Sequence, residues 1–308
     1  QAPPSAHPGL SRSVEIWQVD AFTARPFGGN PAGVVLDAGG LSDAEMWKIA
    51  AEMNVPATAF VAPATRPGHD LKLRWFTPSG KELAFCGHAT VATAHLLAET
   101  GRLSRDRVVF DTLGGTLPVA VAATTERVVI WLEPALPTCA PYPEALGPVL
   151  DALKVSADGV GSWAPPALTG ERDLLIPAAG LEVLKSLAPD MNRLARLGDE
   201  RRIRGFCLTS RETLDRDSLT HSRFFAPHYG IPEDPVSGSV HAAIPVWLWQ
   251  AGLLTAAGGV TRFQAEQGDS LGRPGRLQVE LHVADGRPAR VRVGGRAVTV
   301  LTGSIRVE

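Results

Sequence analysis

The sequence RWFTP at residues 74–78, followed by CGHAT at residues 86–90, indicates the fold more strongly than any other stretch, because the second half of the chain repeats it. The repeat reads RFFAP at residues 223–227 and SGSVH at residues 237–241. In each copy a strand-like run stops at a proline, and a loop then leads to a glycine that opens an apolar segment. This self-similarity predicts an internal duplication.

The spacing of glycines after these motifs also repeats. Gly101 follows Gly87 by fourteen residues, and Gly252 follows Gly238 by the same number. A glycine after an apolar run is a common helix terminator, so each copy predicts one central helix, over residues 88–100 in the first copy. Nearly every face of that helix is apolar, and such a helix has to be surrounded by protein.

Short runs with strand composition flank the first central helix and predict a sheet that wraps around it. These runs are residues 14–19, 33–36, 58–62, 72–76, 107–111 and 117–121. Ser42 followed by Glu45 is a capping-box pattern, which predicts an outer helix over residues 42–53. The expected fold class is therefore α+β, with two pseudo-symmetric domains, each a barrel-like sheet around a central helix.

The boundary between the two domains is expected near residue 130. Residues 133–166 hold seven of the 25 prolines, which is typical of a linker rather than of a core element. We expect a first domain over residues 14–130 and a second over residues 131–308. Residues 291–305 return to strand character, and their assignment to the first or the second domain is open.

Composition excludes several classes of function. The 308 residues, with 44% apolar residues and a net charge of −2, describe a globular protein without an extended field for nucleic acid or anionic lipid. No run of eighteen apolar residues occurs, so no membrane span is expected. Three scattered cysteines without a CxxC pair fit a reducing cytoplasm. The interleaved acids and bases favour a small neutral or acidic substrate. Neither a nucleotide-binding glycine motif nor a metal-ligand cluster is present in the sequence.

The candidate site lies where the two central helices begin. Duplicated units that face each other across a cleft bring equivalent helix N-termini together, and their unpaired N–H groups attract an anion such as a carboxylate. Gly87 and Gly238 stand at these two ends. Either glycine alone would more simply permit a tight turn, whereas the matched pair favours a ligand site.

Three side chains near these ends are candidates for chemistry. Cys86 lies opposite Ser237 in the duplication, and because a serine hydroxyl is too weak a base, a symmetric two-thiol racemase is not expected. Cys86 is then either a small buried hydrophobe or a thiol whose pKa the helix N-terminus lowers. His88 could exchange protons near neutral pH or simply begin the helix, and we favour the first role. Asp234 precedes the second glycine turn, where an ordinary turn aspartate is the alternative.

Taken together and in order, these motifs resemble the PhzF-like family of phenazine-biosynthesis isomerases. The resemblance runs from about residue 14 to the C-terminus and implies the diaminopimelate-epimerase-like fold, often as a homodimer. It also implies isomerase or epimerase chemistry on a small carboxylic acid without metal or organic cofactor. The motifs that carry it lie at residues 20–23, 27–33, 53–54, 58–61, 74–78, 86–90, 223–227, 233–239 and 272–274.

The resemblance also implies roles for individual residues. Two positions match active-site residues of the family, His88 and Asp234. Four are expected to line the substrate, namely Gly87, Gly238, Ser239 and Asn30.

One position departs from the family pattern. The family reads Asn-x-x-Glu-Thr before Phe-Val, and its glutamate shuttles the proton, whereas this chain has Ala57 at that place. A methyl group cannot carry a proton, and loss of a positioned acid/base costs on the order of 10² to 10⁴ in rate. Two explanations stay open. In the first, Ala57 replaces the glutamate of an ordinary isomerase, which then traps its substrate. In the second, a natural lineage lacks the glutamate and either uses His88, Asp234 or Cys86 for other chemistry, such as dehydration, or only binds a small acid.

Overall fold

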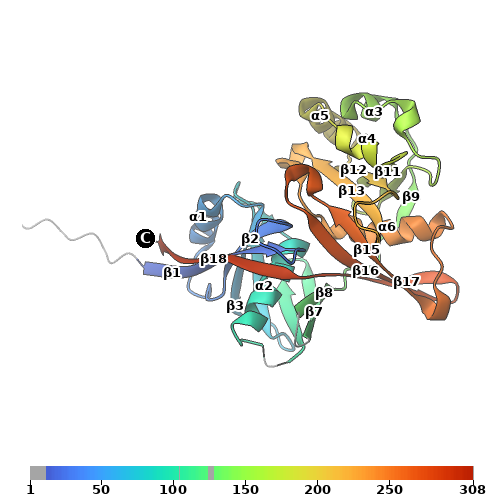
Figure 1. The fold of residues 1–308 in the computed structure, drawn as a ribbon. Coiled ribbons are helices and arrows are strands. Elements are labelled where there is room, and N and C mark those ends of the chain that lie inside the picture. The colour runs from blue at the N-terminus through green and yellow to red at the C-terminus, as the bar shows by residue number, and fades with distance from the viewer. Residues whose placement is uncertain (1–11, 104, 124–127, 308) are drawn as a thin grey trace, which may run out of the picture.

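The computed structural model describes residues 12–103, 105–123 and 128–307, and its ribbon has two lobes, one around α2 and one with α6 (Figure 1). The elements of the first part are β1 Arg12–Ala21, β2 Asn30–Val35, α1 Asp43–Met53, β3 Ala57–Pro63, β4 Leu71–Phe76, β5 Glu82–Leu83, α2 Gly87–Glu99, β6 Arg107–Thr112, β7 Gly115–Ala123 and β8 Val128–Leu132. Those of the second part are β9 Cys139–Pro141, α3 Gly147–Leu153, β10 Ala167–Thr169, β11 Asp173–Pro177, α4 Leu181–Ser186, α5 Met191–Arg201, β12 Gly205–Ser210, β13 Ser218–Ala226, β14 Ile231–Asp234, α6 Gly238–Gln250, β15 Val260–Gln267, β16 Gly275–Ala284, β17 Arg287–Gly295 and β18 Ala297–Val307.

The helices predicted for the first part are confirmed. The Ser42 hydroxyl accepts the Glu45 N–H, and the Glu45 carboxylate accepts the Ser42 N–H, which is the capping box expected at the start of α1. Eight residues of α2 are buried on all of its faces. In α6, nine consecutive residues, 240–248, are buried. Both central helices are therefore enclosed by protein, as their apolar composition requires.

Strand pairing repeats along the chain. In the first part, β2 is parallel to β3, β3 is antiparallel to β4, and β4 is parallel to β6. β6 is then antiparallel to β7, and β7 is antiparallel to β8. In the second part β11, β12, β13, β15, β16 and β17 pair in the same order with the same directions. The chain enters α2 after β5 and α6 after β14, at equivalent places. The predicted duplication and the α+β class are confirmed.

The last two strands connect the lobes. β17 pairs with β16 of the second part and with β8 of the first. β18 then runs antiparallel to β1 along its whole length, so that the two ends of the described chain lie side by side (Figure 1). Residues 291–305 therefore belong to two strands, β17, which pairs with strands of both parts, and β18, which pairs with β1 of the first part. The domain boundary near residue 130 stays a prediction.

The interpretation of residues 133–166 as linker-like is wrong. This stretch contains β9 and α3, and α3 buries Val149, Leu150, Ala152 and Leu153. Val149, Ala152 and Leu153 belong to a separate apolar cluster that also contains residues of α4, α5 and β12. Prolines misled the prediction because Pro148 lies in the first turn of α3, where a missing backbone N–H costs nothing.

A larger apolar cluster spans both parts of the chain. It contains Val91 and Leu96 of α2 together with Val246 of α6 and strand residues from both parts. Because cores are packed at the density of organic crystals, this shared cluster fixes the beginnings of α2 and α6 relative to each other. No helix within the described residues is long and apolar enough to cross a membrane.

Candidate active site

The N-termini of α2 and α6 meet. A β-carbon placed on Gly87 would lie only 3.7 Å from the Cα atom of Gly238. Neither N-cap residue, Cys86 nor Ser237, caps its helix with a side-chain hydrogen bond. The first N–H groups of two helices and the positive ends of two helix dipoles therefore converge on one place. This arrangement suits a carboxylate.

Asp234 ends β14 and is held from several sides. Asn30 Nδ2 donates to Asp234 Oδ1 at 2.7 Å, and the Ser237 hydroxyl donates to Oδ2. Gln267 Nε2 donates to the backbone oxygen of Asp234 at 2.6 Å, while Gln267 Oε1 accepts the Ser237 N–H at 3.1 Å. Burial raises the pKa of Asp234 to about 6, against the opposing hydrogen bonds from Ser237 and Asn30. A carboxyl group that titrates near neutral pH suits general acid or base chemistry.

His88 is the second residue of α2. Its Nδ1 atom lies 3.6 Å from Cys86 Sγ, and its Nε2 atom is buried without a partner among the described residues, although the residue as a whole is partly exposed. Burial lowers the pKa of His88 to about 4, so the imidazole is neutral at pH 7. A buried ring nitrogen without a partner forfeits a hydrogen bond, which a ligand in the site would restore. His88 therefore fits a neutral hydrogen-bonding or proton-transferring role.

Cys86 is a thiol rather than a thiolate in this environment. It is 7% exposed, and burial raises its pKa to about 12, with the charge of Asp234 acting in the same direction. The sequence left open that a helix N-terminus lowers this pKa, and the structure gives the opposite direction because desolvation of the thiolate outweighs the helix end.

Ala57 begins β3 and is fully buried. It pairs with Ala32 of the parallel strand β2, which starts at Asn30, so β2 links position 57 to the residue that holds the Asp234 carboxyl group. Within the described residues, Asn30 Oδ1 and Thr58 Oγ1 are buried without hydrogen-bond partners. Residues of β2 and β3 near position 57 in the sequence and pairing therefore carry polar atoms with unused hydrogen-bonding capacity.

The residues expected to line the substrate occupy different positions in the structure. Gly87 and Gly238 are the first residues of α2 and α6, and Ser239 lies in the first turn of α6. Asn30 is fully buried, and its amide hydrogens go to Asp234 Oδ1 and to the Val236 carbonyl. Asn30 is therefore placed to hold Asp234 rather than to offer hydrogens to a ligand.

Sequence reasoning missed a charged cluster beside Ser239. Arg204 donates from Nε to Asp173 Oδ1 at 2.9 Å and from Nη2 to Asp173 Oδ2. The same Nη2 lies 3.0 Å from Ser239 Oγ and 2.8 Å from Glu171 Oε2. Asp173 and Arg204 meet because β11 and β12 are parallel, with Asp173 opposite Gly205. The sequence shows one charged residue beside each of two apolar runs, Asp173 and Arg204. It does not show that these two runs pair as neighbouring strands.

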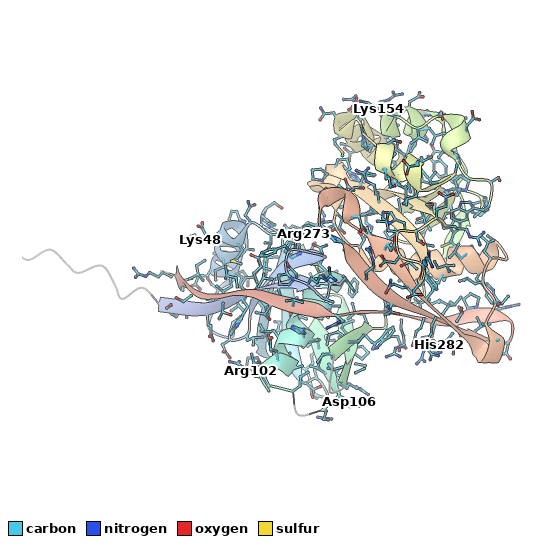
Figure 2. All side chains as sticks on the ribbon, viewed as in Figure 1. Lys48, Arg102, Asp106, Lys154, Arg273 and His282 are labelled. Carbon is cyan, nitrogen blue, oxygen red and sulfur yellow. The ribbon has the colours of Figure 1, made fainter. Side chains whose placement is uncertain are left out.

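Arg273 ties the second part of the chain to the first. Its Nε donates to the Gly29 carbonyl at 3.0 Å, and its Nη2 donates to the Gly28 carbonyl and to Asp20 Oδ1, both at 2.8 Å. Asp20 is 1% exposed, so the ion pair is shielded from water on that side. Figure 2 shows Arg273 near the junction of the lobes. The contact fixes the loop that leads into β2.

The family model described as "Phenazine biosynthesis-like protein" matches residues 19–303. The chain belongs to this PhzC-PhzF family. An uncharacterized isomerase of Clostridium acetobutylicum is 33% identical to it over 300 residues, which cover 96% of this chain and 99% of that protein. The crystal structure of a PhzF-family phenazine biosynthesis protein of Bacillus anthracis has a TM-score of 0.88 and 25% identity, covering 96% of this chain and 99% of that one.

The fold is shared with a solved structure of much lower sequence identity. A hydroxyproline epimerase from Agrobacterium vitis, solved with bound trans-4-OH-L-proline, has a TM-score of 0.61 at 14% identity. The match covers 96% of this chain and 91% of that one. At that identity the likeness concerns the fold alone. The resemblance to PhzF-like isomerases and the diaminopimelate-epimerase-like fold are confirmed.

Proposed function

We propose that this chain is a proton-transferring isomerase or epimerase of a small carboxylic acid, which needs neither metal nor organic cofactor. In this proposal Ala57 stands where the family keeps its shuttle glutamate. The observation that carries the proposal is the meeting of the α2 and α6 N-termini at Gly87 and Gly238. Beside them lie an aspartic acid whose pKa is raised to about 6 and a neutral His88 with a partnerless ring nitrogen.

The proposed mechanism uses the helix ends to stabilise charge. A substrate carboxylate accepts hydrogen bonds from the N–H groups at both ends, and these bonds strengthen when removal of a neighbouring C–H proton sends negative charge onto the carboxylate oxygens. A glutamate at position 57 would take that proton and return it to another position or to the other face of the carbon. The proton removed from carbon is the one returned, and the electron pair of the broken C–H bond forms the new C–H bond. Ala57 cannot perform this transfer, so the chain as found binds its acid and turns it over poorly.

Asp234 and His88 have supporting roles in this mechanism. Neutral His88 offers a hydrogen bond to the reacting acid, and Asp234, held by Asn30 and Ser237, can hold or release a proton near neutral pH. Protonated Cys86 is a poor base at that pH. That argues against epimerisation through Cys86.

Proton exchange in D₂O tests the proposal. Candidate amino acids and cyclic carboxylic acids are offered to the chain as found and to an Ala57→Glu variant, and NMR follows replacement of C–H by C–D. The expected result is exchange of one class of acid by the variant only. Exchange of equal rate by the chain as found would show that His88, Asp234 or Cys86 is the base, and then a natural lineage with different chemistry is the better account.

A second candidate function is binding of a small acid without turnover. It is favoured by the full burial of Ala57 and by the absence of an ionised base at Cys86. For this candidate, Ala57→Glu leaves exchange undetectable while the affinity for the acid persists, measured by calorimetry. A hydroxyproline epimerase of the same fold holds an amino acid, which supports a small acid as the ligand in either case. Assembly into a homodimer stays a prediction.

A further inference from the structure

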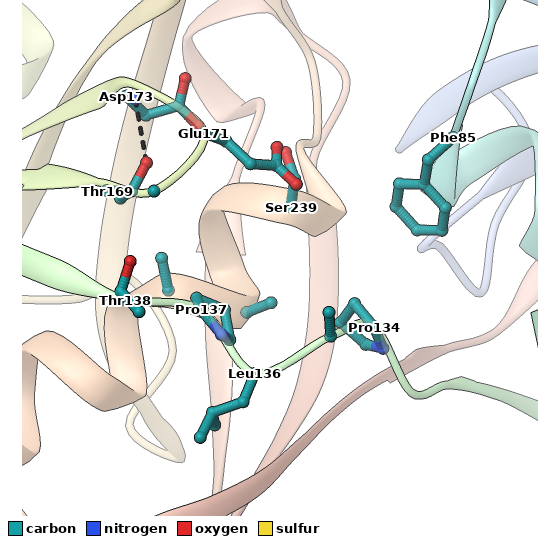
Figure 3. Close-up of a pocket in the computed structure, with 13 residues that line it drawn as sticks. Phe85, Pro134, Leu136, Pro137, Thr138, Thr169, Glu171, Asp173 and Ser239 are labelled. Carbon is teal, nitrogen blue, oxygen red and sulfur yellow. Dashed lines mark hydrogen bonds between the residues drawn. The ribbon is translucent and has the colours of Figure 1, made fainter. Parts of the chain in front are cut away.

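A cavity of about 160 Å³ opens beside the N-terminus of α6 (Figure 3). Ser239 lines it, and so does Phe85, whose ring lies 3.7 Å from a β-carbon placed on Gly87. The cavity therefore borders the meeting point of α2 and α6. An engineered apolar cavity of about 150 Å³ accepts benzene, so a ring or a branched aliphatic group fits this one. Much of the remaining wall is apolar, including Pro134, Leu136, Pro137 and Ala243.

The wall of the cavity around Ser239 carries surplus negative charge. Arg204 Nη2 bears two hydrogens, but three acceptors lie within reach: Asp173 Oδ2, Ser239 Oγ at 3.0 Å and Glu171 Oε2 at 2.8 Å. The Asp173 side chain is only 2% exposed and also binds Arg204 Nε, so it keeps the guanidinium. The Glu171 side chain is 61% exposed and is the acceptor most easily released. One guanidinium cannot neutralise both carboxylates, and the surplus charge attracts a cation.

We propose that Glu171 is a specificity-determining residue, which binds the ammonium group of an α-amino acid whose apolar side chain occupies this cavity. The inference rests on the proposed function, because the carboxylate of the same ligand lies on the N–H groups of α2 and α6. Figure 3 shows the Glu171 side chain directed toward Ser239, with Phe85 on the other side of the cavity.

The spacing of the groups favours an α-amino acid over acids with a distant amine. Glu171 Oε2 and Ser239 Oγ both neighbour the same nitrogen atom of Arg204, at 2.8 and 3.0 Å, so their separation cannot exceed the sum of these two distances. An α-amino acid carries its ammonium and its carboxylate on one carbon atom and therefore matches this short spacing. An amine at the end of a long side chain would instead fall among the apolar wall residues.

Equilibrium binding to the chain as found tests this inference without any turnover. Both enantiomers of phenylalanine and leucine are compared by calorimetry with their deaminated counterparts, 3-phenylpropanoate and 4-methylpentanoate. We expect at least one amino acid to bind more tightly than its counterpart. Glu171→Gln should weaken binding of that amino acid by about threefold to tenfold, the range expected for a charged contact at a partly exposed site, without weakening binding of its counterpart. Glu182→Gln, which changes an 85% exposed glutamate on α4, is the matched control and should change neither affinity.

Two results would overturn the inference. One is that none of the amino acids binds more tightly than its counterpart, including the case in which none binds at all. The other is that Glu171→Gln changes the affinities for amino acid and counterpart by the same factor. A separate result would refute the proposed function alone. If the Ala57→Glu variant exchanges no proton while Glu171→Gln weakens binding of the amino acid and not of its deaminated counterpart, proton transfer is refuted and the ammonium site stands.

Discussion

Asp234→Asn keeps the shape of a partly buried side chain and removes its charge. Asn30 can still donate to Oδ1, and the Ser237 hydroxyl can turn to accept from the new amide, so the local hydrogen bonds are retained in number. The substitution removes the cost of ionising a partly buried carboxyl group, which the raised pKa of Asp234 expresses. We therefore expect a more stable and less active protein at alkaline pH.

The magnitude follows from the two pKa values. A rise from 3.8 to about 6 corresponds to ~3 kcal/mol. Because the pKa is raised, the folded protein binds more protons than the unfolded chain between these values, and the contribution of Asp234 to stability falls as the pH rises through that window. The variant lacks this loss. Its free energy of unfolding should match that of the original chain near pH 4 and exceed it by up to about 3 kcal/mol at pH 8.

Urea denaturation at pH 4, 6 and 8 measures this difference. Asp158→Asn, which alters an exposed carboxyl group, is the control for loss of a charge at the surface. The reasoning is refuted if Asp234→Asn destabilises the chain at pH 8, or if its effect on the free energy of unfolding is the same at all three pH values.

Three further predictions concern neighbouring residues. Cys86→Ser, placed in the Ala57→Glu variant, should leave proton exchange within about threefold, because a thiol of raised pKa is not the base; loss of exchange in NMR would make Cys86 essential. Arg273→Lys should lower the free energy of unfolding by about 1 to 3 kcal/mol in urea titration, since lysine cannot reproduce the forked contacts, and an unchanged midpoint would contradict that. Ala57→Glu should lower the free energy of unfolding in urea titration by about 1 to 3 kcal/mol, and by more at pH 8 than at pH 5, because the new carboxyl group is buried. A free energy of unfolding of this variant that rises relative to the original chain between pH 5 and pH 8 would count against this prediction.

Much of the fold could be predicted because its signals are local and occur twice. The proline after each strand-like run and the glycine before each apolar helix mark equivalent places in β4 and β13 and at the starts of α2 and α6. The failure over residues 133–166 is also local in origin. Proline marks the beginnings of elements as well as the gaps between them, and Pro148 lies in the first turn of a helix that buries four of its residues.

The candidate site could be predicted only in part. Gly87 and Gly238 were identifiable because the duplication makes them equivalent, and His88 follows directly from its place on α2. The cluster of Arg204, Asp173 and Glu171 depends on a parallel pairing between distant strands, which no local pattern reveals. The raised pKa of Cys86 depends on burial by residues far along the chain, and the sequence alone shows only the helix end that acts against it.

Glutamate and glutamine at position 57 distinguish a proton shuttle from a side chain that only fills space. Ala57→Glu and Ala57→Gln introduce side chains of nearly equal size, and only the first can take a proton from carbon. For the acid found to exchange, the account predicts a rate of C–H to C–D exchange in D₂O that is at least about a hundredfold higher with glutamate. Equal rates in the two variants would mean that position 57 contributes shape rather than a proton shuttle, and the account would be wrong.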